Sequence, residues 1–147
     1  MSRTDGQSQV AAAPGRRLTV LERASVVGEI VVTYARVRWQ VRRRDLPSAV
    51  AVLRTTRHRG RRPPLLAGED RRLAAAAERV LARLPGDSRC LTRSLVVLTM
   101  LARRGIEVRL VLAARPTPTF AAHAWVERAG HPLLPTRGFG DARLTEL

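Results

Sequence analysis

The arrangement of hydrophobic and polar positions predicts helices throughout the first two thirds of the chain. Over residues 18–44, apolar residues recur at three- and four-residue spacing, which is the period of one helix face. Residues 69–84 are rich in Ala and Leu, with acids first and Arg later, an order that complements the helix dipole. A further apolar stripe over residues 88–104 ends at Gly105, and glycine is typical of a helix C-terminus. Together with a short helix over residues 47–55, the pattern predicts four helices.

The last third of the chain changes to strand-like patterns. Residues 106–113 (IEVRLVLA) alternate and contain β-branched side chains, and residues 120–127 (FAAHAWVE) form a second strand pattern. The dipeptide at 129–130 (AG) suits a turn into a third, short strand over residues 131–135 (HPLLP). We therefore expect an α+β fold in which helices precede an antiparallel sheet.

Composition divides the chain into three parts. Residues 1–16 are polar, contain Gly and Pro, and are expected to be disordered. The basic segment RTTRHRGRRPPLL contains a Pro pair and marks a boundary between a helical N-terminal region, residues 17–62, and a core over residues 63–147.

The sequence contains neither a signal-peptide pattern nor an apolar run of the roughly 18 residues that a membrane span requires. We expect a cytoplasmic protein that makes no membrane contact.

Charge narrows the choice of partners. The formal net charge is +15, and all 27 basic residues are Arg. Such a charge favours anionic partners, including acidic peptides and nucleic acid. The arginines are spread along the whole chain, however, and no zinc-finger spacing or aromatic RNA-binding signature occurs, so we do not expect nucleic acid. One Cys and three scattered His residues provide no metal-ligand spacing, and we expect neither a metal nor another cofactor.

The single cysteine, Cys90, is the first candidate for chemistry. It would lie in the first turn of the helix predicted over residues 88–104, where free N–H groups stabilise an anion. Arg89 and Arg93 add positive charge, and a neighbouring imidazole would complete an ion pair that favours the thiolate. The same N–H groups could stabilise the oxyanion formed when a thiolate attacks a carbonyl. The alternative is that Cys90 is a small apolar residue buried in the core.

The second candidate is His123, in the middle of the strand predicted over residues 120–127. On a strand, His123 shares one face with Trp125 and Glu127. Taken alone, His123 is better explained as a half-buried strand histidine without a chemical role. We expect Trp125 to pack beside His123 and to form part of a substrate wall. His58 and His131 lie outside patterned elements and are expected to be solvated.

Joined together, these segments resemble a known family. A Cys at a helix N-terminus followed by a His on an antiparallel strand is the layout of papain-like and transglutaminase-like cysteine enzymes. The segments RCLTRSLVVLTMLARRGIEVRLVLA and FAAHAWVERAGHPL are similar to those of the leader peptidases of lasso-peptide biosynthesis. The likeness covers about residues 88–134, and in the family the nucleophile matches Cys90 and the general base matches His123.

The resemblance implies a function and partners. A leader peptidase cuts a ribosomally made precursor peptide between its leader and its core, exposing the amino terminus that a separate macrolactam-forming cyclase uses. It works with a small leader-recognition protein, which holds the leader region. The precursor, this recognition protein and the cyclase are therefore the expected partners.

The third member of a catalytic triad is where the sequence departs from the family. Its members often carry an Asp about a dozen residues after the His, whereas residues 132–136 contain no carboxylate. If the turn has two residues, Thr136 lies opposite His123, so a Thr hydroxyl or a backbone carbonyl could orient the imidazole. Asp141 is the nearest downstream acid and could fold back. Glu127 lies about 13 Å along the strand from His123, which argues against an orienting role.

Three alternatives stay open at this point. The chain could be a transglutaminase-like enzyme acting on another peptide or transferring an amide, because the chemistry is the same up to the thioester. It could instead be a leader-binding module without catalysis. The third alternative, a non-enzymatic nucleic-acid-binding protein, is supported only by the net charge of +15.

Overall fold

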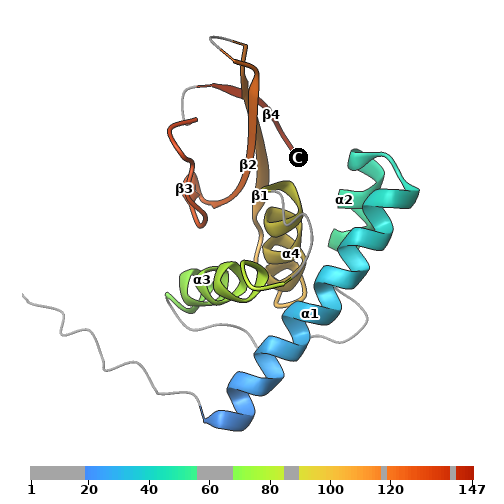
Figure 1. Ribbon diagram of the computed structural model, residues 1–147, viewed down its shortest axis with the longest axis vertical. Helices are drawn as coiled ribbons and strands as arrows, with labels where there is room; N and C mark the ends of the chain where they lie inside the picture. Colours follow the sequence, from blue (N-terminus) through green and yellow to red (C-terminus); the bar gives the residue numbers. More distant parts are fainter. Residues whose placement is uncertain (1–18, 56–67, 85–89, 117–118, 140–141) are drawn as a thin grey trace, which may run out of the picture.

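The computed structural model describes residues 19–55, 68–84, 90–116, 119–139 and 142–147 (Figure 1). The described helices are α1 (Val20–Arg43), α2 (Leu46–Thr55), α3 (Glu69–Leu81) and α4 (Cys90–Ala102). They are followed by the strands β1 (Arg109–Arg115), β2 (Ala121–Arg128), β3 (His131–Pro132) and β4 (Arg143–Glu146). The expected α+β fold, with helices first and an antiparallel sheet after them, is confirmed.

Helix α4 lies at the centre of the molecule. It packs against α1, α2 and α3 and against β1 and β2, and Figure 1 shows it between the long helix α1 and the sheet. Every residue from Ser94 to Ala102 is buried, because helices and strands surround this part of α4. The helix is followed by Gly105 at φ +74°, and Ile106 N–H donates to the Leu101 carbonyl. This left-handed ending favours glycine, as the sequence predicted.

A buried ion pair joins α1 to the end of α4. The guanidinium of Arg104 donates two hydrogen bonds, of 2.9 and 2.8 Å, to the carboxylate of Glu29. Both side chains are largely removed from solvent, so each charge depends on the other for compensation. The pair fixes where the C-terminal end of α4 lies against α1, while the opposite end of α4 begins at Cys90.

The sheet has the strand order β3-β2-β1-β4, and all its pairings are antiparallel. The turn between β2 and β3 consists of Ala129 and Gly130, both with positive φ, which is the two-residue turn expected from the sequence. The strand predicted over residues 131–135 is shorter in the structure, where β3 covers only His131–Pro132. Proline has no N–H to donate to a ladder, so Pro132 and Pro135 limit the strand.

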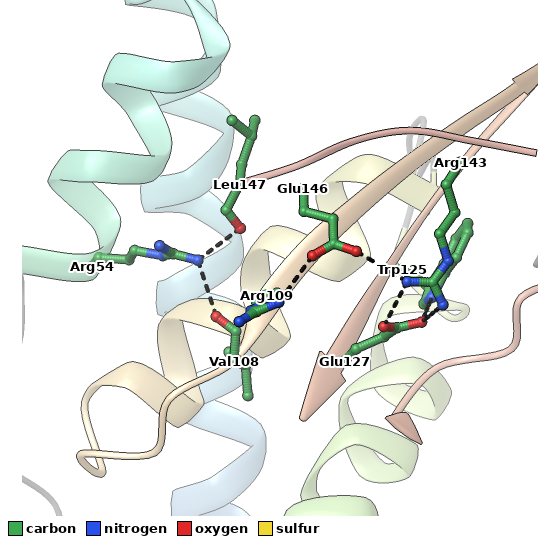
Figure 2. Close-up of polar contacts among 8 residues, drawn as sticks. All are labelled: Arg54, Val108, Arg109, Trp125, Glu127, Arg143, Glu146 and Leu147. Atoms are coloured by element: carbon green, nitrogen blue, oxygen red, sulfur yellow. Dashed lines mark hydrogen bonds and ion pairs between the residues drawn. The ribbon is translucent and has the colours of Figure 1, made fainter. Parts of the chain in front are cut away.

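Strand β4 was not predicted. Its four residues, RLTE, are all exposed and show no apolar alternation, so the sequence contains no strand signal there. The strand forms because β1 offers a free edge: Leu147 and Leu110 exchange two backbone hydrogen bonds of 2.8 Å. The Arg54 side chain on α2 donates to the carbonyls of Leu147 and Val108, at 2.7 and 3.0 Å, and so holds this end of β4 (Figure 2).

The other predicted boundaries shift by a few residues. β1 begins at Arg109, three residues later than expected, and α3 ends at Leu81. Residues 1–16 lie outside the described residues, and the division into regions 17–62 and 63–147 stays a prediction. No helix in the described part of the chain is long and apolar enough to cross a membrane.

Candidate active site

Helix α4 and strand β2 bring Cys90 and His123 to one cavity of about 390 Å³. Cys90 is the first residue of α4, and His123 is the third residue of β2. The Ser94 hydroxyl, one turn into α4, donates a buried hydrogen bond of 2.9 Å to the Ala124 carbonyl on β2. This bond ties the helix that carries the thiol to the strand that carries the imidazole.

The surroundings of Cys90 are those of a helix start. The side chain is half-buried, and the cavity reaches it. The first N–H groups of α4 have no acceptor within the helix, so they can stabilise negative charge on a thiolate or on an oxygen atom beside it. Arg93, one turn further along α4, lines the same cavity. Arg89, the other arginine singled out from the sequence, lies outside the described residues.

The imidazole of His123 is oriented by a backbone carbonyl. His123 is 8% exposed, and its Nε2 lies 2.8 Å from the carbonyl oxygen of Pro135. A carbonyl only accepts hydrogen bonds, so the proton of a neutral imidazole is assigned to Nε2. The other nitrogen, Nδ1, then carries the lone pair and can act as a base. A backbone carbonyl, which the sequence analysis considered beside the Thr136 hydroxyl and Asp141, makes this contact.

Two aromatic rings fix the tilt of the imidazole. Trp125 stacks on it with ring centroids 5.9 Å apart and an angle of 24° between the planes. Phe139 lies 5.6 Å away at 38°. Arg115 lies over the ring of Phe139, 4.7 Å from its centroid, and holds Phe139 in this position. The sequence offered no signal for Phe139, which follows β3 in a segment without periodicity.

The other residues that the sequence analysis named have different surroundings in the structure. Trp125 is fully buried, so it packs beneath the imidazole instead of forming a wall of the cavity. Thr136 is half-buried and follows the residue whose carbonyl binds His123. Asp141 and His58 lie outside the described residues. His131 is exposed at the hairpin turn, with Nδ1 3.0 Å from the Ala129 carbonyl.

The cavity also contains residues that the sequence did not single out. α3 contributes Glu78, which no motif indicates because it lies on a helix read only for its periodicity. The wall beside His123 is made of small side chains, which leave the imidazole accessible. The lining residues not yet named in this role are Ser94, Ala121, Ala122, Ala124, Leu134, Pro135, Arg137 and Phe139. Among the described residues, no group of three His, Cys, Asp or Glu side chains could hold a metal ion.

A thiol and an imidazole beside one cavity, with the imidazole held through Nε2, suit nucleophilic chemistry on a carbonyl. The comparisons with known proteins agree with this layout. Residues 31–143 match the family described as the transglutaminase-like superfamily, and this span runs from within α1 to the start of β4. No curated protein and no solved structure matches the chain. Because the match covers more than half of its length, the chain belongs to the transglutaminase-like superfamily.

Proposed function

We propose that this protein is a cysteine peptidase that removes the leader from a ribosomally made lasso-peptide precursor. The observation that carries the proposal is the shared cavity of Cys90 and His123, with Nε2 of His123 engaged by the Pro135 carbonyl. Superfamily membership supports chemistry at a cysteine. The choice of a lasso-peptide precursor rests on the motif around residues 88–134.

The proposed chemistry uses the two side chains in turn. Nδ1 of His123 takes the proton of the Cys90 thiol, and the thiolate attacks the carbonyl carbon of the scissile peptide bond. The oxyanion that forms is stabilised by N–H groups at the start of α4. Nδ1–H then protonates the leaving amine, which departs as the core peptide with a free amino terminus. Water, deprotonated by Nδ1, attacks the thioester, releasing the leader as a carboxylic acid and restoring the thiol.

The proposed partners are the leader region of the precursor and a small leader-recognition protein, with the macrolactam-forming cyclase downstream. The described residues are used almost entirely for the helical core, the sheet and the cavity. A separate recognition protein would raise the local concentration of the leader to roughly millimolar over a short connection.

The direct test replaces each of the two residues. Purified protein is incubated with a precursor and its recognition protein, and products are followed by mass spectrometry. Cys90→Ala should lower the cleavage rate by about four orders of magnitude or more, since the nucleophile is then absent. His123→Ala should lose cleavage while keeping its circular dichroism spectrum. His131→Ala is the matched control, because His131 is exposed at the hairpin turn, and it should cleave like the unchanged protein.

The products separate this function from its alternatives. Hydrolysis yields two fragments whose masses sum to the precursor plus one water. A transferase would instead join the acyl group to an added amine, with loss of the leaving amine. Maturation that persists in Cys90→Ala would refute the peptidase and favour a leader-binding module.

A further inference from the structure

We propose that Arg143 and Glu127 are positioning residues, which hold the imidazole of His123 in its reactive orientation through Trp125. The inference deepens the proposed function and rests on it in one respect: that His123 acts as the base. The two residues come from different strands, and neither is among the residues that line the cavity. We therefore assign their effect on the reaction to the side chains that lie between them and His123.

The first step is the contact between Trp125 and His123. The two rings are stacked with centroids 5.9 Å apart, and Trp125 is fully buried. Because His123 is attached to the strand only through its Cβ, the imidazole can turn about its side-chain torsions unless neighbours prevent it. The indole blocks this turning on one side, so the orientation of the imidazole depends on the orientation of the indole.

The second step is the hydrogen bond that fixes the indole. Nε1–H of Trp125 donates to Oε1 of Glu127 over 2.7 Å. Glu127 is 4% exposed, and burying a carboxylate is costly unless it is paired and hydrogen-bonded. If Trp125 were its only partner, the Glu127 carboxylate would carry a negative charge in the protein interior without a compensating positive charge.

Arg143 supplies that compensation from β4, as Figure 2 shows. Its guanidinium donates to both carboxylate oxygens of Glu127, at 2.8 and 3.1 Å, and lies 5.8 Å from the centroid of the Trp125 ring. The hydrogen bond to Glu127 is the main cause that raises the pKa of Arg143 above its ordinary value. Arg143 therefore holds the carboxylate through a charge-assisted fork and covers the indole at the same time.

The register of the sheet explains how Arg143 reaches this place. Ala113 on β1 is paired with His123 on one side and with Arg143 on the other. Directly paired residues share one face of a sheet, and the small side chain of Ala113 leaves room for the long Arg143 to cross β1. The β1–β4 register shifts between Leu112 and Ala113, so that Arg143, and not Leu144, stands opposite Ala113. Such a bulge re-aims a side chain.

The composition of this cluster favours positioning over stability. Only the Glu127 half of the ion pair is buried, since the Arg143 side chain is 41% exposed, and such a pair is weak evidence for a gain in stability. Apolar side chains, however, would not fix the indole through a directed hydrogen bond. The cluster thus supplies orientation, which matters here because a displacement of about 1 Å at a reacting group can cost about a hundredfold in rate.

The test compares Arg143→Met with Arg109→Met. Both arginines bind Glu146 at 3.1 Å on the same face of the sheet, but Arg109 contacts Glu146 in an exposed pair away from the indole. Arg143→Met should lower kcat for precursor cleavage by about ten- to a hundredfold with little change in KM. Arg109→Met should leave both constants within about twofold of the unchanged protein, since exposed pairs contribute little. Arg143→Lys, which keeps the charge but not the fork, should recover part of kcat.

A spectroscopic measurement tests the same idea without any substrate. In long-range ¹H–¹⁵N spectra, neutral His123 of the unchanged protein should show one tautomer with the proton on Nε2. Arg143→Met and Trp125→Phe, which keeps a ring but loses the indole N–H, should both show a mixture of tautomers. His58→Ala and His131→Ala assign the other two signals.

The outcomes are distinct. An Arg143→Met protein with the kcat and the His123 spectrum of the unchanged protein would overturn the inference. Equal losses in Arg109→Met would also overturn it, because the cause would then be a loosened sheet edge. If Arg143→Met fails to fold, Trp125→Phe gives the answer by the same two measurements. If the unchanged protein cleaves no precursor, the proposed function fails, while the tautomer spectra still decide the positioning role.

Discussion

Ser94 shows how much of the candidate site depends on a single buried hydroxyl. Its hydrogen bond to the Ala124 carbonyl joins the helix of Cys90 to the strand of His123. The Ser94 side chain is completely buried, so removing its hydroxyl takes a buried donor away from the carbonyl. The relative position of thiol and imidazole therefore depends on this bond as well as on apolar packing.

Ser94→Ala should lower the free energy of unfolding by about 1–3 kcal/mol, because a buried carbonyl is left without its donor. It should also lower kcat, because α4 can then shift against β2. Thr99→Val is the matched control on the same helix: the Thr99 hydroxyl bonds to the Leu95 carbonyl within α4 and spans no interface. Urea unfolding and cleavage kinetics measure the two effects. A loss of kcat in Thr99→Val as large as in Ser94→Ala would contradict this account.

Among the elements, α3 and β2 are joined by an ion pair that depends on pH. Arg128 on β2 donates a 2.7 Å hydrogen bond to Asp70, in the first turn of α3. Burial alone would raise the pKa of Asp70, but the hydrogen bonds from Arg128 and from the Arg71 N–H outweigh it. The pKa of Asp70 therefore lies below its ordinary value of 3.8.

A depressed pKa in the folded state means that Asp70 stabilises the protein at any pH above the ordinary value of 3.8. This contribution is lost as the pH falls through the lower pKa of the folded state. Asp70→Asn should cost about 1 kcal/mol at pH 7, since Arg128 is half exposed, and the cost should shrink below pH 3.8. Urea unfolding across this range measures it. In an Arg128→Met background the same change should have a smaller effect.

At the scale of the whole molecule, the net charge of +15 means that the basic residues outnumber the acidic ones that could pair with them. Arg42, Arg43 and Arg44 are exposed at the end of α1, and we propose this surface as the one that meets an acidic partner. The first residue of the basic segment, Arg54, differs from these three arginines because it has a structural role. Arg54 binds two backbone carbonyls inside the protein, and residues 56–67 lie outside the described residues.

The proposed recognition protein should therefore accelerate cleavage in a way that weakens with salt. Exposed charges act over about 10 Å at 0.1 M salt and about 3 Å at 1 M. Arg42→Gln/Arg43→Gln should need more partner for half-maximal rate at low salt. The control is Arg71→Gln/Arg72→Gln, which makes the same change of charge at exposed positions of α3. It should reach half-maximal rate at a lower partner concentration than Arg42→Gln/Arg43→Gln. A rate independent of the partner would refute docking, and a rate independent of salt would remove only the role of the arginines.

The motifs shared with a known family singled out Cys90 and His123. Local patterns in the sequence determined the helices, three of the four strands and the hairpin turn. These features depend on side-chain periodicity and on turn and cap residues, which are close together along the chain. Tertiary structure alone decided that the Pro135 carbonyl holds Nε2, that Phe139 packs against the imidazole, and that β4 exists. The physical reason is that these contacts join residues that are distant in sequence. They depend on how far β3 extends before its prolines and on the bulge that aims Arg143, and neither leaves a periodic signal.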